Sequence, residues 1–230
     1  MFINRRKIEF IGLFTPSLYN RKEMIGVNIL NNSNPLDEFR KRNGQELIIN
    51  LNNKIKACSK CDNNFCHKCY LGNSSAKILI INDNATNDKE VLTYYYDLLA
   101  MSDLNESDVM QVYAVSCVTT RKDKEDTIQR LPSKKECNNC KEYLNEITDI
   151  IKPKVIISLG ATALNQFMPG SNLLEYINTK QVFNGIPTLI NYSIKDLFNL
   201  SAYKTYEETN EISTSILRTF NDAAKYIKED

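Results

Sequence analysis

Short apolar runs alternate with amphipathic segments along the second two-thirds of the chain. The runs are rich in β-branched residues, as expected of central parallel strands that are buried on both faces. They cover residues 77–82, 109–116, 154–159 and 187–192. Strands that alternate with helices predict an α/β fold, in which a three-layer αβα sandwich surrounds a central, mainly parallel four-stranded sheet.

The segments between these runs have the spacing of helices. Apolar residues recur every three or four positions in 88–101, 138–151 and 210–228, and a further helix begins after the third strand. Pro153 ends the second of these helices directly before that strand. Ligands of open parallel sheets bind at the carboxyl ends of the strands. The loops at those ends begin at Asp83, Cys117, Gly160 and Ser193.

The N-terminal part of the chain has a different pattern. Residues 1–44 end in a turn signal, "RNGQ" at 42–45, and contain one strand-like run, "KIEFIGLF" at 7–14. We therefore predict an N-terminal extension over residues 1–44 and one domain over residues 45–230. The extension is a candidate surface for a protein partner.

Composition narrows the class of protein. The 230 residues are 42% hydrophobic and 25% charged, as in an ordinary globular protein. No run approaches the ~20 apolar residues that span a bilayer, and no leader pattern opens the chain, which predicts a cytoplasmic protein without membrane contact. The net charge of +1 excludes coating of nucleic acid by charge alone. Residues 1–56 nevertheless hold ten Lys or Arg against five Asp or Glu, which indicates either a solvated surface or a face that contacts phosphates.

Seven cysteines are the main candidates for chemistry. In the cytoplasm thiols stay reduced, so clustered cysteines indicate metal binding or redox chemistry. Three Cys-x-x-Cys pairs occur, and four thiolates from such pairs suit either Zn²⁺ or an iron–sulfur cluster. The pairs are Cys58/Cys61, Cys66/Cys69 and Cys137/Cys140. Cys117 follows a strand as a single cysteine, which a zinc ribbon built from two pairs would not need. His67, the only histidine, lies among these cysteines, which argues against Ser-His-Asp and Cys-His hydrolases.

Two blocks of sequence resemble a known family. Residues 108–121, "DVMQVYAVSCVTTR", carry a strand and a third cysteine. Residues 140–164, "CKEYLNEITDIIKPKVIISLGATAL", carry a fourth cysteine, a helix, a "P-x-V-I" strand and "LG-x-x-A". In this order they resemble the iron–sulfur uracil-DNA glycosylases, family 4 of that superfamily, over roughly residues 45–200. The resemblance implies a uracil-DNA glycosylase-like fold, a 4Fe–4S cluster and DNA as a partner.

The resemblance also implies which thiols bind the cluster. By position, Cys117 and Cys140 become ligands. The distance to the first strand makes Cys58 and Cys61 the first pair, whereas the following "YL" would favour the Cys66/Cys69 pair. We favour Cys58 and Cys61. The spare thiols are alternates or ligands of a second metal: Cys66, Cys69 and Cys137.

The chain departs from the family at the positions that carry its chemistry. The "GE-x-PG" loop reads "NDNAT" at 82–86, which keeps only Asp83 at the acidic place, and the "G-x-PFVG-x-AG" stretch is missing. The Asn that reads the uracil edge falls at Tyr113, and the "HP" that stabilises the departing base falls at Ser193-Ile194. Base recognition needs an amide and glycosidic cleavage needs stabilised charge, so these losses imply that standard uracil excision is absent.

Asp83 and a basic loop remain as candidate functional groups. Asp83 is either a helix cap or a carboxylate that orients water. The basic side chains after Cys117 either contact DNA phosphates or carry solvated charge; they are Arg121, Lys122 and Lys124.

Three functions are consistent with the sequence. The leading hypothesis is a glycosylase-like iron–sulfur protein that binds nucleic acid or a replication or repair partner without standard excision. The first alternative is an active DNA glycosylase with an altered base preference that uses Asp83. The second alternative is a zinc-stapled protein-interaction module.

Overall fold

A computed structural model describes residues 35–61, 67–123 and 126–228. Contacts between Cα atoms divide the chain into 1–34 and 35–230, and the fold below is that of the second unit. The strand predicted at 7–14 lies outside the described residues. None of the described helices is long and apolar enough to cross a membrane.

Helix α1, Pro35–Lys56, runs through the segment that the sequence predicts as a turn. A Cβ atom at Gly44 would lie 2.6 Å from Ser74 Cβ, so this glycine allows the helix to approach the 72–75 segment closely. Further along α1, Ile48, Leu51 and Ile55 are buried. The turn prediction was wrong because tertiary packing of the helix outweighs the local preference of Asn-Gly. The proposed boundary at residue 44 falls within this helix.

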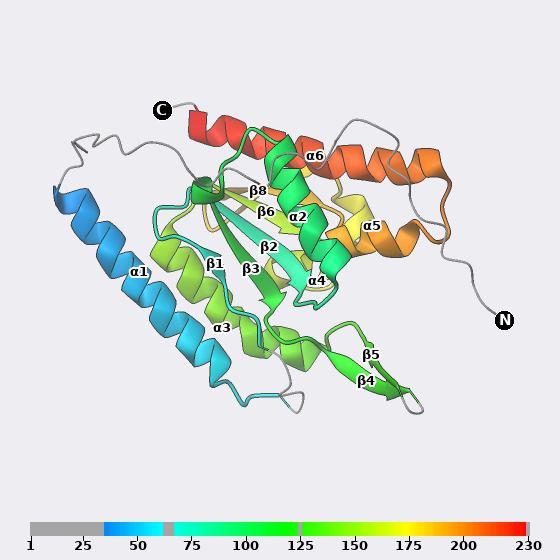
Figure 1. Ribbon diagram of the computed structural model, residues 1–230, viewed down its shortest axis with the longest axis horizontal. Helices are drawn as coiled ribbons and strands as arrows, with labels where there is room; N and C mark the ends of the chain where they lie inside the picture. Colours follow the sequence, from blue (N-terminus) through cyan, green and yellow to red (C-terminus); the bar gives the residue numbers. More distant parts are fainter. Residues whose placement is uncertain (1–34, 62–66, 124–125, 229–230) are drawn as a thin grey trace, which may run out of the picture. The chain divides into compact units, whose positions relative to one another are not determined.

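The central sheet has six strands in the order β1–β3–β2–β6–β8–β7 (Figure 1). The inner four are parallel and are the four that the apolar runs predict: β2 Ile78–Asn84, β3 Val109–Val115, β6 Val155–Leu159 and β8 Ile186–Asn191. The predicted count of four was wrong because two antiparallel edge strands were not recognised. These are β1, Leu71–Gly72, and β7, Thr179–Phe183. The first is only two residues long and the second is partly exposed throughout, so neither gives a continuous apolar run.

Helices cover both faces of the sheet, which confirms the three-layer αβα architecture (Figure 1). Side chains alternate along each strand, so Ile78 and Ile80 pack toward one layer and Leu79 and Ile81 toward the other. The first layer is formed by α2 Lys89–Met101, α5 Ile194–Leu200 and α6 Tyr206–Lys228. The second is formed by α1, α3 Lys134–Ile151 and α4 Ala161–Phe167. Short 3₁₀ helices cover Glu106–Asp108 and Leu173–Glu175.

A two-stranded hairpin follows β3 and stands apart from the main sheet (Figure 1). Its strands are β4 Thr120–Asp123 and β5 Asp126–Gln129. Both the hairpin and the segment that carries Cys117 come directly after the carboxyl end of β3. The fold therefore brings cysteines and basic side chains to the edge of the sheet where ligands of such sheets bind.

Candidate functional site

Four thiols gather beyond the carboxyl end of β3. Cys117 and Cys140 are 5% and 4% exposed and pack together against Val115. Burial raises the pKa of Cys117 to about 12, and the nearby thiols of Cys140, Cys61 and Cys58 add to the shift. Burial likewise raises the pKa of Cys140 to about 11, with Cys61, Cys58 and Cys137 adding to it. These four cysteines, which come from three separate parts of the chain, thus lie within electrostatic reach of one another.

The loop that carries Cys58 and Cys61 is held against α3. The amide nitrogen of Asn139 donates to the Lys60 carbonyl at 3.0 Å and to Cys61 Sγ at 3.3 Å. Lys60 forms an ion pair with Glu142, and its ammonium lies 5.4 Å from the centre of the Tyr143 ring. The Cys58–Cys61 loop is therefore placed by contacts other than those that a metal would provide.

Cys137 is a further thiol beside the same cluster. It packs against Cys117 and Cys140. Burial raises its pKa, and the added electrostatic effects come from Glu136 and Asp83. Its thiol is thus within electrostatic reach of Cys140 as well as of Asp83.

The second Cys-x-x-Cys pair is only partly described. Cys66 lies outside the described residues, and Cys69 is half-buried. His67 pairs with Cys117 through the backbone, which places this segment beside the end of β3. Within residues 35–61, 67–123 and 126–228, no three His, Cys, Asp or Glu side chains form a group that could hold a metal ion. The six described cysteines are free thiols, and an all-sulfur donor set has the chemistry that iron–sulfur clusters and structural zinc require.

Asp83 lies at the carboxyl end of β2 and caps a helix that is distant in sequence. Its Oδ1 accepts hydrogen bonds from the backbone N–H groups of Thr162 at 2.6 Å and Ala163 at 3.1 Å, in the first turn of α4. A Cβ atom at Gly160, whose φ is 95°, would lie 2.6 Å from the carboxylate carbon, so this close approach requires glycine. Burial raises the pKa of Asp83 to about 7 and Asp196 adds to the shift, while the two N–H groups oppose it.

A small cavity lies next to Asp83, on the face of the sheet that α2 covers. Its volume is about 30 Å³, roughly a tenth of the ~300 Å³ at which ligand pockets begin. Its lining includes three amides, Asn82, Asn84 and Gln111. Asn84 is 4% exposed, and its Oδ1 accepts no hydrogen bond from the described residues. Asn84 and Gln111 are not among the site residues that the sequence predicts, although each follows the two-residue spacing of side chains on one face of its strand.

Two positions at which the sequence departs from the family have structural roles here. Tyr113 is buried and packs against Ala85 and Val118, beside the small cavity. Ser193 begins α5, where its hydroxyl accepts a hydrogen bond from Asp196 N at 2.9 Å and forms a capping box. Tyr113 and Ser193, at the positions where the resemblance leads us to expect an amide and a histidine, therefore fill the core and cap a helix.

The basic hairpin is anchored at its base by an ion pair. Arg130 donates from both terminal nitrogens to the Glu136 carboxylate, each at 2.8 Å, and from Nε to the Thr120 carbonyl at 3.1 Å. The hydrogen bonds from Arg130 lower the pKa of Glu136 to about 2. Arg121 and Lys122, on β4, are exposed, and Lys124 lies outside the described residues. Two of the three side chains that are predicted to contact phosphate thus lie on this anchored hairpin, which follows the segment that carries Cys117.

Comparison with known proteins gives two matches. The model of the uracil DNA glycosylase superfamily matches residues 69–219. The chain is 25% identical to the type-4 uracil-DNA glycosylase of Thermotoga maritima over 201 residues. This aligned stretch covers 81% of this chain and 97% of that protein. The family match contains Cys117 and Cys140 and begins after Cys58 and Cys61.

Proposed function

Because the chain belongs to the uracil DNA glycosylase superfamily, we propose that it is an iron–sulfur protein that binds nucleic acid without standard uracil excision. The observation that carries this proposal is that Asp83 is buried and caps α4. The single carboxyl at the family's acidic position is buried and hydrogen-bonded to α4. The adjoining cavity of about 30 Å³ is too small for a flipped base.

In this proposal Cys58, Cys61, Cys117 and Cys140 hold a 4Fe–4S cluster, and binding it would draw these thiols closer together than the structure of the described residues places them. The effects of Cys58 and Cys61 on the pKa of Cys117 and of Cys140 support this set over one that contains Cys69. When bound, such a cluster would join the loop after α1 to the end of β3 and to α3 through its iron–thiolate bonds. The protein would support cluster binding in two ways. The loop at Lys60 is held in place by a hydrogen bond to α3, and Cys117 and Cys140 are buried from solvent.

The hairpin is the proposed nucleic-acid contact, and its test is an electrophoretic shift on single- and double-stranded DNA at two salt concentrations. We expect the Arg121→Gln, Lys122→Gln double variant to bind at least tenfold more weakly at low salt. We also expect a plot of its log Kd against the logarithm of the salt concentration to be less steep, with a slope smaller by about one for each lost phosphate contact. The matched control is Lys204→Gln, Lys228→Gln, which removes two charges in surface ion pairs from α6 and the loop before it.

Absence of any shift by the wild-type protein at low salt, together with no copurifying protein, would contradict the proposal. A shift that both double variants weaken equally would show that binding depends only on total charge. A replication or repair partner that binds through residues 1–44 remains part of the proposal, as does the cytoplasmic location.

A second candidate, an active glycosylase with an altered base preference, is favoured by the unpaired Oδ1 of Asn84 beside Asp83. An amide is the group that reads the edge of a flipped base. This function predicts cleavage of at least one base in an oligonucleotide panel of deaminated and damaged bases. Asp83→Asn should lower the single-turnover rate at least a hundredfold, because the variant keeps the shape of the site and loses the carboxylate. A panel in which no base is cleaved removes this candidate.

A further inference from the structure

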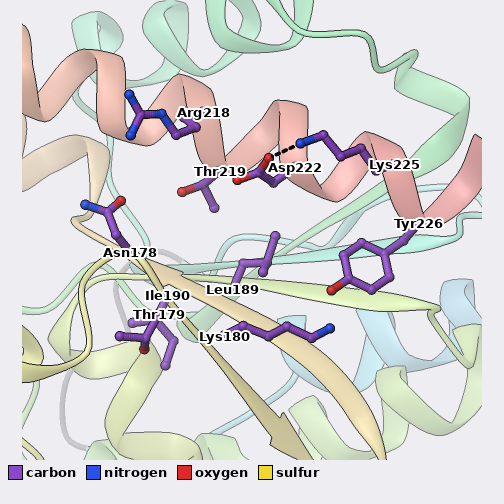
Figure 2. Close-up of a pocket in the computed structure, with 10 residues that line it drawn as sticks. All are labelled: Asn178, Thr179, Lys180, Leu189, Ile190, Arg218, Thr219, Asp222, Lys225 and Tyr226. Carbon is purple, nitrogen blue, oxygen red and sulfur yellow. Dashed lines mark hydrogen bonds and ion pairs between the residues drawn. The ribbon is translucent and has the colours of Figure 1, made fainter.

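A second and much larger cavity lies between α6 and the β7–β8 edge of the sheet (Figure 2). Its volume is about 540 Å³, within the range of roughly 300–1,000 Å³ that is typical of small-molecule sites. It shares no lining residue with the small cavity beside Asp83, and no cysteine lines it. It is therefore a separate candidate site.

The cavity is lined by three cationic side chains and one acid. Lys180 comes from β7, while Arg218, Asp222 and Lys225 lie on α6, on the opposite wall (Figure 2). The carboxylate of Asp222 is already paired with the Lys225 ammonium at 2.6 Å. Arg218 forms no ion pair or hydrogen bond with the residues that the structure describes. The lining is thus positive and favours an anion.

The rest of the lining suits a flat, partly apolar group. Leu189 of β8 gives the cavity an apolar wall, while the side chain of Ile190 packs on the other face of the sheet. The Tyr226 ring lies at the end of the cavity opposite Arg218 (Figure 2). The Lys180 ammonium lies 5.0 Å from the centre of that ring. Eight positions of helix separate Arg218 from Tyr226, which is about 12 Å along the axis. A ligand with an anion at one end and a flat ring at the other matches this length.

A polar network that runs from the buried Asn191 to the exposed Asn178 lies at the end of the cavity near Arg218. Asn178 Oδ1 accepts from Asn191 Nδ2 at 3.1 Å and from Ser215 Oγ at 2.6 Å. Asn191 is fully buried and also donates to Thr219 Oγ1 at 2.7 Å. The amide nitrogen of Asn178 makes no hydrogen bond with the described residues, so it is available as a donor beside Arg218. Such a donor next to a guanidinium suits phosphate.

We propose that this cavity binds a nucleoside monophosphate, with the phosphate at Arg218 and Asn178 and the base against Leu189 and Tyr226. The same chemistry is found in a free nucleotide and in the 5′-phosphorylated end of a DNA strand. The site does not depend on the cysteines, on Asp83 or on the hairpin, so its existence is independent of the proposed function.

Isothermal titration of the full-length, anaerobically purified protein with adenosine 5′-monophosphate tests the site. We expect one saturable site, and weaker binding of adenosine alone and of inorganic phosphate alone. Arg218→Gln should weaken binding at least tenfold, and Tyr226→Leu should weaken binding of the nucleotide more than that of phosphate. Lys228→Gln is the matched control, because it removes a positive charge from α6 outside the cavity, and it should change Kd less than twofold.

The same titration with short 5′-phosphorylated and unphosphorylated oligonucleotides distinguishes the two sources. Preference for the phosphorylated strand end over the free nucleotide, lost in Arg218→Gln, assigns the site to DNA ends, and the reverse order assigns it to free nucleotides. No saturable binding of any of these probes at millimolar concentration overturns the proposal. Equal loss of affinity in Arg218→Gln and Lys228→Gln also overturns it, because binding would then follow total charge.

Discussion

Replacing Cys117 with serine is expected to reduce iron and acid-labile sulfide from about four of each per chain to near zero. Cys117 is buried against Cys140 and within electrostatic reach of Cys58 and Cys61. A serine hydroxyl stays protonated there and is a far weaker ligand for iron than a thiolate. Metal and sulfide analysis with the visible spectrum, on anaerobically purified wild type and variant, measures this change. Cys140→Ser should have the same effect.

Two other cysteines serve as controls for this experiment. Cys137→Ser removes a thiol that packs against the same cluster but is not in the proposed ligand set, and Cys69→Ser removes one from the other Cys-x-x-Cys pair. Both variants should keep their iron and sulfide. Loss of the cluster in Cys69→Ser but not in Cys58→Ser would reassign the first pair of ligands. Zinc without iron, unaffected by Cys117→Ser, would contradict the cluster and favour a zinc-stapled interaction module.

Replacing Asp83 with asparagine is expected to raise the free energy of unfolding at pH 8, by up to about 4 kcal/mol. The pKa of this carboxyl is 3.8 in the unfolded chain and about 7 in the folded protein. Its contribution to stability is therefore complete below about pH 3.8 and is lost as the pH rises through about 7. Asparagine stays neutral and still offers an oxygen to the N–H groups of Thr162 and Ala163. Urea denaturation at pH 5.5 and pH 8 measures the difference.

The control for this prediction is Asp83→Ala. Alanine also removes the charge, but it leaves two buried N–H groups of α4 without an acceptor, which costs about 1–3 kcal/mol. The alanine variant should therefore be less stable than the asparagine variant at both pH values. An asparagine variant that is less stable than wild type at pH 8 would show that the folded protein holds Asp83 as a carboxylate, available for catalysis.

Short-range sequence patterns determined the middle of this fold. The four inner strands are continuous apolar runs because both of their faces are buried, and α2, α3 and α6 show the three- and four-residue spacing of helices that pack on one face. These patterns depend only on neighbouring residues, so the α/β class and the αβα layers could be predicted. Together with the spacing of the cysteines, the order of these elements also indicated the superfamily. Which thiols act as ligands stays a prediction.

Only the tertiary structure decided how the distant segments combine. The edge strands β1 and β7 depend on pairing with β3 and β8, which their own sequences do not show. Asp83 finds its hydrogen-bond donors at Thr162 and Ala163, about 80 positions along the chain. The cavity between α6 and the sheet joins residues 178–190 to residues 218–226. The reason is that these hydrogen bonds and cavities form where segments far apart in sequence meet. The periodicity of one segment does not show which other segment it will contact.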